Sequence, residues 1–146
     1  MRGFHAGGTG KVRVGAGNRW ETGVIVHAYG GAINLGSNVF LGPYTVIYGH
    51  GGVEVGDDTL ISMHCRVLSS EHSVPSMTRR IRWEPDRLMS TRIGRDVWLG
   101  AGVTVLGGVN IGDGCVIGAG AVVTGDLSAG SVAAGIPARV LRQRPA

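Results

Sequence analysis

Aliphatic residues recur every six positions along the second half of the chain. From Ile93 the sequence divides without a gap into six hexads, and each begins with Ile, Leu or Val. The fifth position of each hexad is a small or medium apolar residue, and glycine follows the first position in four of the six. Two inward-pointing positions per six residues are what a short flat strand followed by a turn requires. The pattern therefore predicts stacked short strands joined by glycine turns.

The same frame continues upstream with interruptions. Nine earlier hexads open at Val14, Trp20, Val26, Leu35, Leu41, Ile47, Val55, Ile61 and Val67. If three hexads close one triangular turn, the fifteen form about five coils of an all-β parallel β-helix. Coils about 4.8 Å apart make a prism roughly 24 Å tall. A stack of this kind needs a cap at each end, and we expect the caps in the N-terminal residues and after Ser128.

Three insertions interrupt the frame without changing its phase. Extra residues occur around Gly30, around Gly51 and in the segment 73–92, each time in the third hexad of a coil. All three should therefore project from one edge of the prism, where function is expected. The longest, 73–92, forms one protruding loop with no strand or helix period, and it contains Trp83 and five arginines. A loop this long in a compact domain is functional or disordered.

Composition narrows the class of protein. The chain has 27 glycines and only 5% aromatic residues, so Val, Ile, Leu and Ala must form the core of one domain spanning residues 1–146. The net charge of +4 comes almost entirely from arginine, which indicates either a solvated surface or attraction for an anionic ligand. No basic run is interleaved with aromatic residues, which argues against a nucleic-acid partner.

The cysteines and the N-terminus indicate where the protein works. Cys65 and Cys115 both occupy fifth positions of hexads and show no metal or redox spacing, so we expect buried, reduced thiols. The N-terminus lacks the apolar stretch of a signal peptide, and no window approaches a membrane span. We therefore expect a cytoplasmic protein.

Two sequence stretches and their order carry a family resemblance. The hexads containing IGAGAVVTGD and the following AAGIPARVLR are similar to the C-terminal half of hexapeptide-repeat acetyltransferases, a group that includes galactoside, maltose and polysaccharide O-acetyltransferases. The resemblance covers nearly the whole chain from about Leu35. Its most specific element is the succession of Glu71-His72, a long loop, IGRDVWLGAG, IGAGAVVTGD and GIPAR at 135–139. It implies a left-handed β-helix.

The resemblance also implies a chemistry. In this family three chains form a homotrimer, each active site lies between two prisms, and a histidine just before the long loop, here His72, is the general base. A hydroxyl that attacks a thioester must lose its proton, and imidazole titrates near working pH. The backbone amide of Ala101 would stabilise the oxyanion. Acetyl-CoA would be a co-substrate, with no tightly bound cofactor and no metal.

Further site residues follow from the same resemblance. The expected coenzyme A contacts are Trp98, Ala101, Ala119, Thr124, Arg139 and Arg142. The acceptor would meet Trp83 and His64, where His64 either makes a hydrogen bond or only lines the groove. The stretches Leu41–Tyr44 and Gly49–Val53 are similar to enzymes that decorate surface polysaccharides or nucleotide sugars, which favours a sugar hydroxyl, with an amino sugar still open. His27 and His50 are interpreted as exposed turn residues on the insertion edge.

Two other classes of protein use the same prism. A γ-type carbonic anhydrase would bind zinc through three converging imidazoles, for which His50, His64 and His72 are the available residues. The chain lacks that family's closely spaced histidine pair and its Arg-x-Asp strand motif. A non-catalytic assembly module would have no reason to combine a histidine before the loop with C-terminal arginines. The sequence therefore favours an acetyl-CoA-dependent O-acetyltransferase.

Overall fold

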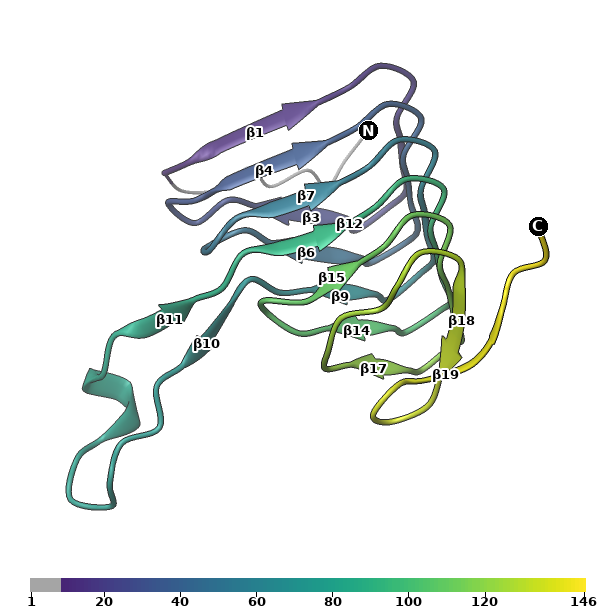
Figure 1. Cartoon of the computed structure of the whole chain (residues 1–146). Helices are drawn as coiled ribbons and strands as arrows, with labels where there is room; N and C mark the ends of the chain where they lie inside the picture. The colour runs from purple at the N-terminus through teal and green to yellow at the C-terminus, as the bar shows by residue number, and fades with distance from the viewer. Residues whose placement is uncertain (1–8) are drawn as a thin grey trace.

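The computed structural model describes residues 9–146 and shows a three-sided stack of parallel strands (Figure 1). Residues 1–8, where the N-terminal cap is expected, lie outside the described residues. Fifteen strands in three sheets form five coils, and the hexads place each coil in register with the next. The predicted fold class, an all-β parallel β-helix of about five coils, is confirmed.

Each sheet takes one strand from every coil. Sheet A contains β1 (Lys11–Val14), β4 (Ala32–Leu35), β7 (Val53–Val55), β12 (Thr91–Ile93) and β15 (Asn110–Ile111). Sheet B contains β2 (Arg19–Trp20), β5 (Phe40–Leu41), β8 (Leu60–Ile61), β13 (Trp98–Leu99) and β16 (Val116–Ile117), extended by β18 (Ser131–Ala134) and β19 (Arg139–Gln143). Sheet C contains β3 (Ile25–His27), β6 (Val46–Tyr48), β9 (Arg66–Val67), β14 (Thr104–Val105) and β17 (Val122–Val123).

The core runs along the axis of the prism and consists of the predicted hexad positions. The first positions from Ile93 onward and the fifth positions from Val97 to Leu127 are all buried. Cys65 and Cys115 are fully buried free thiols, as expected, and burial raises the pKa of each. The first coil differs, because Val14, in the outermost strand of sheet A within the described residues, is 45% exposed.

Two corners of the prism matter for the site. Corner BC is the set of turns from sheet B to sheet C, at residues 21–23, 42–44, 62–64, 100–102 and 118–120. Corner CA is the set of connections from sheet C to sheet A, and all three insertions lie there, at residues 28–31, 49–52 and 68–90. The prediction that the insertions share one edge is confirmed.

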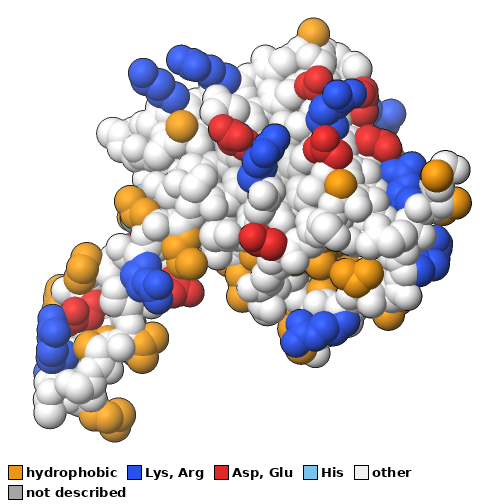
Figure 2. Space-filling view, in the orientation of Figure 1, with side chains coloured by type: hydrophobic (Ala, Val, Ile, Leu, Met, Phe, Trp, Pro, Cys, Tyr) orange, Lys and Arg blue, Asp and Glu red, His pale blue; other side chains and the backbone are white. Residues whose placement is uncertain are grey.

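The longest insertion is an arm with its own secondary structure. Strand β10 (Ser70–His72) pairs antiparallel with β11 (Asp86–Leu88), and the 3-10 helix η1 (Ile81–Trp83) lies between them. The loop expected at 73–92 is therefore shorter in the structure. Antiparallel pairing satisfies the backbone N–H and C=O groups of its stem, and β12 already begins at Thr91. The arm stands clear of the prism and carries exposed apolar and arginine side chains (Figure 2).

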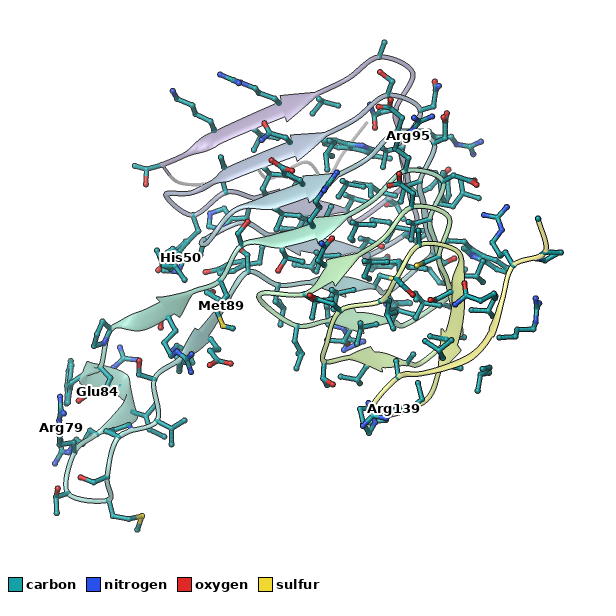
Figure 3. The ribbon with its side chains drawn as sticks, viewed as in Figure 1. His50, Arg79, Glu84, Met89, Arg95 and Arg139 are labelled. Carbon is teal, nitrogen blue, oxygen red and sulfur yellow. The ribbon has the colours of Figure 1, made fainter. Side chains whose placement is uncertain are left out.

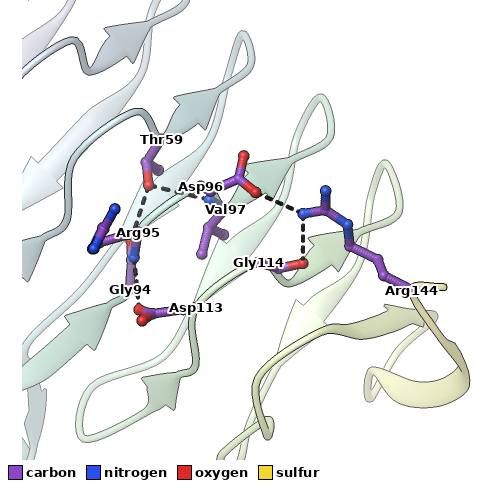
Figure 4. Close-up of polar contacts among 8 residues, drawn as sticks. All are labelled: Thr59, Gly94, Arg95, Asp96, Val97, Asp113, Gly114 and Arg144. Atoms are coloured by element: carbon purple, nitrogen blue, oxygen red, sulfur yellow. Dashed lines mark hydrogen bonds and ion pairs between the residues drawn. The ribbon is translucent and has the colours of Figure 1, made fainter. Parts of the chain in front are cut away.

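The C-terminal segment closes the other end of the stack. Strand β18 continues sheet B beside β16, and β19 folds back antiparallel on β18. The Arg144 guanidinium then donates to Asp96 at 2.9 Å and to the carbonyl of Gly114 at 3.1 Å (Figure 4). The predicted cap after Ser128 is thus present as a hairpin fixed to two earlier coils.

A buried threonine holds the turn between sheets A and B. The hydroxyl of Thr59, which is fully buried, donates to the carbonyl of Gly94 at 2.9 Å and accepts from the amide of Val97 at 3.3 Å (Figure 4). Thr59→Val should lower the free energy of unfolding by about 1–3 kcal/mol, because both backbone groups lose this buried partner. Urea unfolding at fixed protein concentration measures it, with the exposed Thr22→Val as control. Equal stability of both variants would contradict this role.

Candidate active site

His72 lies at the base of the arm, opposite an aspartate. The register of the hairpin pairs His72 with Asp86, and Nδ1 of His72 is 2.7 Å from Oδ1 of Asp86. An Nδ1–H that donates to this carboxylate leaves the lone pair of Nε2 free to accept a proton. The His72 side chain is 75% exposed and Asp86 29% exposed. A carboxylate beside one ring nitrogen is an arrangement that general-base catalysis can use, and the sequence analysis did not single out Asp86.

His50 approaches the same carboxylate from the neighbouring insertion. Its Nδ1 is 3.4 Å from Oδ2 of Asp86, and its side chain is only 22% exposed. The Nδ1 atom is itself buried and makes no hydrogen bond within the described residues, so the contact is a close approach rather than a formed hydrogen bond. Figure 3 shows His50 at the edge of the prism where the arm begins. The interpretation of His50 as an exposed turn residue is therefore wrong, because the arm covers it.

Four rings, one of them that of His50, form a cluster at corner CA. Tyr29 meets His50 edge to face at 4.8 Å and stacks on Tyr48 at 5.3 Å. His27 contacts both tyrosines, at 5.3 and 5.6 Å, and is half-buried rather than exposed as expected. Burial, then Tyr29 and Asp86, raise the pKa of Tyr48, so its phenol stays protonated. We call His27, Tyr29, Tyr48 and His50 the ring cluster.

The expected coenzyme A and oxyanion residues Ala101 and Ala119 lie at corner BC. Both are exposed, and their turns stack directly, since the amide of Gly120 donates to the carbonyl of Ala101 at 2.8 Å. Gly102 and Gly120 have φ of +71° and +73°, and a Cβ on either would meet nothing within 4 Å. This part of the corner is an open strip of bare backbone, suited to the close approach of an extended chain.

The same corner carries rings at the level of the second and third coils. His64 stacks on Tyr44 with centroids 5.4 Å apart and planes 11° apart. Both residues have a left-handed backbone conformation, with φ of 58° for His64 and 60° for Tyr44. The equivalent positions in the fourth and fifth coils are the glycines Gly102 and Gly120. The exposed Trp98 is nearby, and its indole nitrogen donates to the hydroxyl of Ser62 at 3.2 Å. His64 and Trp98 therefore border the open strip.

The remaining candidate residues are spread over the C-terminal hairpin, corner CA and the arm. Arg139 pairs with Ala134 at the end of β18, and Arg142 pairs with Val132 further along the hairpin. Both arginines are exposed. Thr124 follows β17 at corner CA, and Trp83 is 71% exposed in η1.

One chain does not bring the candidate base to the candidate coenzyme site. His72 and Asp86 lie at corner CA, whereas Ala101, Ala119 and His64 lie at corner BC, on opposite edges of sheet C. Figure 3 likewise shows His50 and Arg139 well apart on the molecule. A site that uses both groups therefore needs corner CA of one chain beside corner BC of another.

Two kinds of feature are absent from residues 9–146, a cluster that could hold a metal ion and a helix that could cross a membrane. In this range no cluster of three or more His, Cys, Asp or Glu side chains is arranged to hold a metal ion. Nor does any helix in the described part of the chain have the length and apolar character to cross a membrane.

Comparison with known proteins identifies the family. The family model for bacterial transferase hexapeptide (six repeats) matches residues 90–125. The chain is 36% identical over 86% of its length to galactoside O-acetyltransferase of Escherichia coli, 61% of which it spans. It is 34% identical over 92% of its length to the Escherichia coli protein WbbJ, named for O-acetyl transfer in lipopolysaccharide biosynthesis, 72% of which it spans. The chain belongs to the hexapeptide-repeat acetyltransferase family.

A solved structure agrees with this assignment. Galactoside acetyltransferase in complex with coenzyme A superposes with a TM-score of 0.80 and 32% identity, covering 90% of this chain and 64% of that one. The left-handed β-helix implied by the resemblance is therefore confirmed. The chain spans only part of several curated relatives, among them 40% of a Mycobacterium tuberculosis protein named as an acetyltransferase, to which it is 36% identical.

Proposed function

We propose that this chain, as one domain, transfers an acyl group, acetyl by default, from coenzyme A to a hydroxyl of a sugar, nucleotide sugar or polysaccharide precursor. His72 is the general base. The observation that carries the proposal is the 2.7 Å contact between Nδ1 of His72 and Asp86. A carboxylate at this distance favours the tautomer that carries its proton on Nδ1, which leaves Nε2 to accept a proton. Relatives named as acetyltransferases support the reaction class.

The reaction needs no covalent enzyme intermediate, because the thioester is already activated. Nε2 of His72 takes the proton of the acceptor hydroxyl while the oxygen forms a bond to the thioester carbonyl carbon. The carbonyl oxygen becomes an oxyanion, which the amide of Ala101 stabilises. The carbon–sulfur bond then breaks, and the proton on His72 passes to the departing thiolate. The products are an ester and coenzyme A.

Coenzyme A is assigned to corner BC. The strip of bare backbone at Gly102 and Gly120 accepts an extended pantetheine arm beside Ala101 and Ala119. The contacts at the nucleotide end are the exposed Arg139 and Arg142, since guanidinium forks bind phosphates well. Trp98 completes the coenzyme site at this corner, and Thr124, which lies at corner CA, reaches it from the adjacent copy of the chain.

The assembly is a homotrimer. A contact between corner CA of one copy and corner BC of the next is head-to-tail, and such contacts close into a ring when the rotation allows. Three copies of a three-sided prism make such a ring, with each active site between two chains. In it the base of one chain meets the thioester bound to its neighbour.

The acceptor is assigned to the space between the ring cluster and the arm. Tyr29, 48% exposed, offers an aromatic ring beside His50, and aromatic faces suit the apolar face of a sugar ring. Trp83 adds an exposed ring from the arm. His64 would reach the acceptor from the coenzyme side. An amine at the same position would give N-acylation by the same steps.

A thiol-release assay tests the reaction. Purified protein and acetyl-CoA are incubated with a panel of sugars, nucleotide sugars and amino sugars, and free coenzyme A is followed with Ellman's reagent. Release that depends on one acceptor is expected. The protein's own thiols give little background, because Cys65 and Cys115 are buried and burial raises their pKa. Absence of release with every acceptor would overturn the assigned substrate class.

A further inference from the structure

We propose that His50 is a positioning residue for the acyl transfer, and this rests on His72 being the base. Its Nδ1 atom lies beside the one carboxylate oxygen of Asp86 that His72 leaves free. Oδ1 of Asp86 is 2.7 Å from His72, while Oδ2 is 3.4 Å from Nδ1 of His50. The carboxylate therefore lies between two imidazoles. His50 acts on the base only through Asp86.

Packing alone does not account for a histidine here. The Nδ1 atom of His50 is buried, and no hydrogen bond to it is formed within residues 9–146. A buried polar atom without a partner costs free energy that an apolar ring of similar size would avoid. Asp86 is the charged group that faces this atom. A contraction of a few tenths of an ångström would turn the approach into a hydrogen bond.

The loop that carries His50 is fixed to the base of the arm. The amide of Gly51 donates to the hydroxyl of Ser69 at 3.0 Å, and that hydroxyl donates to the carbonyl of Tyr48 at 2.7 Å. The carbonyl of Ser69, in turn, accepts from the amide of Met89 at 2.8 Å. Ser69 is fully buried. This one serine thus joins the His50 loop to the residues flanking both strands of the hairpin that positions His72 and Asp86.

The ring cluster sets the plane of the His50 imidazole. Tyr29 meets it at 90° and is itself stacked on Tyr48. Tyr29 has a φ of 45°, a conformation that is rare for a bulky residue and that persists where the surroundings require it. The backbone strain at Tyr29 places its ring where it can hold His50 toward Asp86. Sequence insertions in two successive coils therefore build one support for the carboxylate.

The consequence is control of the His72 tautomer. A carboxylate held on Oδ2 cannot rotate away from His72, so the Nδ1–H of His72 keeps its acceptor and Nε2 keeps its lone pair. Without His50, Asp86 turns toward solvent for part of the time. The base is then correctly oriented in a smaller fraction of molecules. The effect falls on kcat rather than on the KM for acetyl-CoA.

Two substitutions separate this role from packing. His50→Phe keeps a ring against Tyr29 but removes the donor, whereas His50→Asn places an amide nitrogen near the position of Nδ1. We expect His50→Phe to lower kcat roughly tenfold, the equivalent of one hydrogen bond to a charged group once the 3.4 Å approach has closed, and His50→Asn to recover most of that loss. In an Asp86→Asn background, His50→Phe should add almost nothing. Additive losses, or equal losses in both His50 variants, would overturn the proposal.

A spectroscopic measurement keeps the test independent of activity. In the ¹⁵N spectrum of labelled histidines, with the His72 signal assigned by its loss in His72→Ala, we expect the Nδ1–H tautomer of His72 in the wild type and in His50→Asn. A mixture of tautomers is expected in His50→Phe. An unchanged tautomer in His50→Phe would refute the positioning role. If the tautomer responds as expected but His72→Ala retains full activity, the proposed function fails while the support of Asp86 stands.

Discussion

His72→Ala should lower kcat for acetyl transfer by about 10²–10⁴-fold, the usual contribution of a positioned general base. The loss follows because the proposed mechanism assigns the acceptor proton to Nε2 of His72, and water takes that proton poorly. The affinity for coenzyme A should not change, since its contacts are assigned to corner BC. Steady-state thiol release measures kcat, and calorimetric titration with coenzyme A measures binding.

The control for the His72→Ala variant is a substitution of Glu71, the neighbouring residue in the same strand. Glu71 pairs with Arg87 at 2.8 Å across the hairpin, and both side chains are at least half exposed. Such an ion pair contributes little to stability, so Glu71→Gln should retain nearly full kcat. A His72→Ala protein that assembles, binds coenzyme A and keeps the wild-type kcat would show that another group is the base.

The sequence predicts the scaffold well because its repeat is a packing requirement. Each coil must place apolar side chains in the narrow interior, so positions such as Ile93, Val97 and Leu99 follow from the six-residue period alone. The insertions keep this phase, and their common edge follows from counting hexads. The folding of the arm is not governed by that period, which explains why its hairpin was not predicted.

The sequence contains a signal for the missed partner of His72. Glu71-His72 and Asp86-Arg87 each place an acidic residue before a basic one, so antiparallel pairing sets each acidic residue opposite a basic one. The structure pairs them in this way. Thirteen residues lie between His72 and Asp86, and no periodic pattern links the two. The hairpin is visible only when the complementary charges are compared across the loop.

The burial of His27 and His50 could not be predicted in the same way. His27 ends β3 just before one short insertion, and His50 lies in another, where exposure is the ordinary expectation. The partial burial of His27 depends on rings from successive coils meeting at one corner, and that of His50 also depends on the arm, through Asp86. This depends on coil stacking and on the conformation at Tyr29, neither of which a single insertion reveals.

The candidate residues lie on two corners of the prism, although the family resemblance places them in one succession of motifs. Sequence order places His72 and Ala101 in one motif succession, but sheet C separates them in a single chain. The proposed trimer accounts for this arrangement, because neighbouring chains then supply opposite sides of one cleft. Variants at the two corners should therefore be analysed as parts of one site contributed by two subunits.

Asp86→Asn should lower kcat by on the order of 10²-fold while the KM for acetyl-CoA stays within about threefold. The replacement is isosteric but removes the charge that stabilises the protonated imidazole. An amide can also present its N–H₂ group to Nδ1 of His72, which then becomes an acceptor and moves the ring proton to Nε2. That tautomer cannot act as a base through Nε2.

The matched control is Asp113→Asn at the corner between sheets A and B. Oδ1 of Asp113 accepts from the amide of Arg95 at 2.8 Å (Figure 4), and an asparagine oxygen can do the same. The Asp113→Asn variant should keep the wild-type kcat. The ¹⁵N spectrum of His72 should change to the Nε2–H form in Asp86→Asn and remain unchanged in Asp113→Asn. Wild-type kcat in Asp86→Asn would mean that His72 does not depend on this carboxylate, and the oriented base would have to be abandoned.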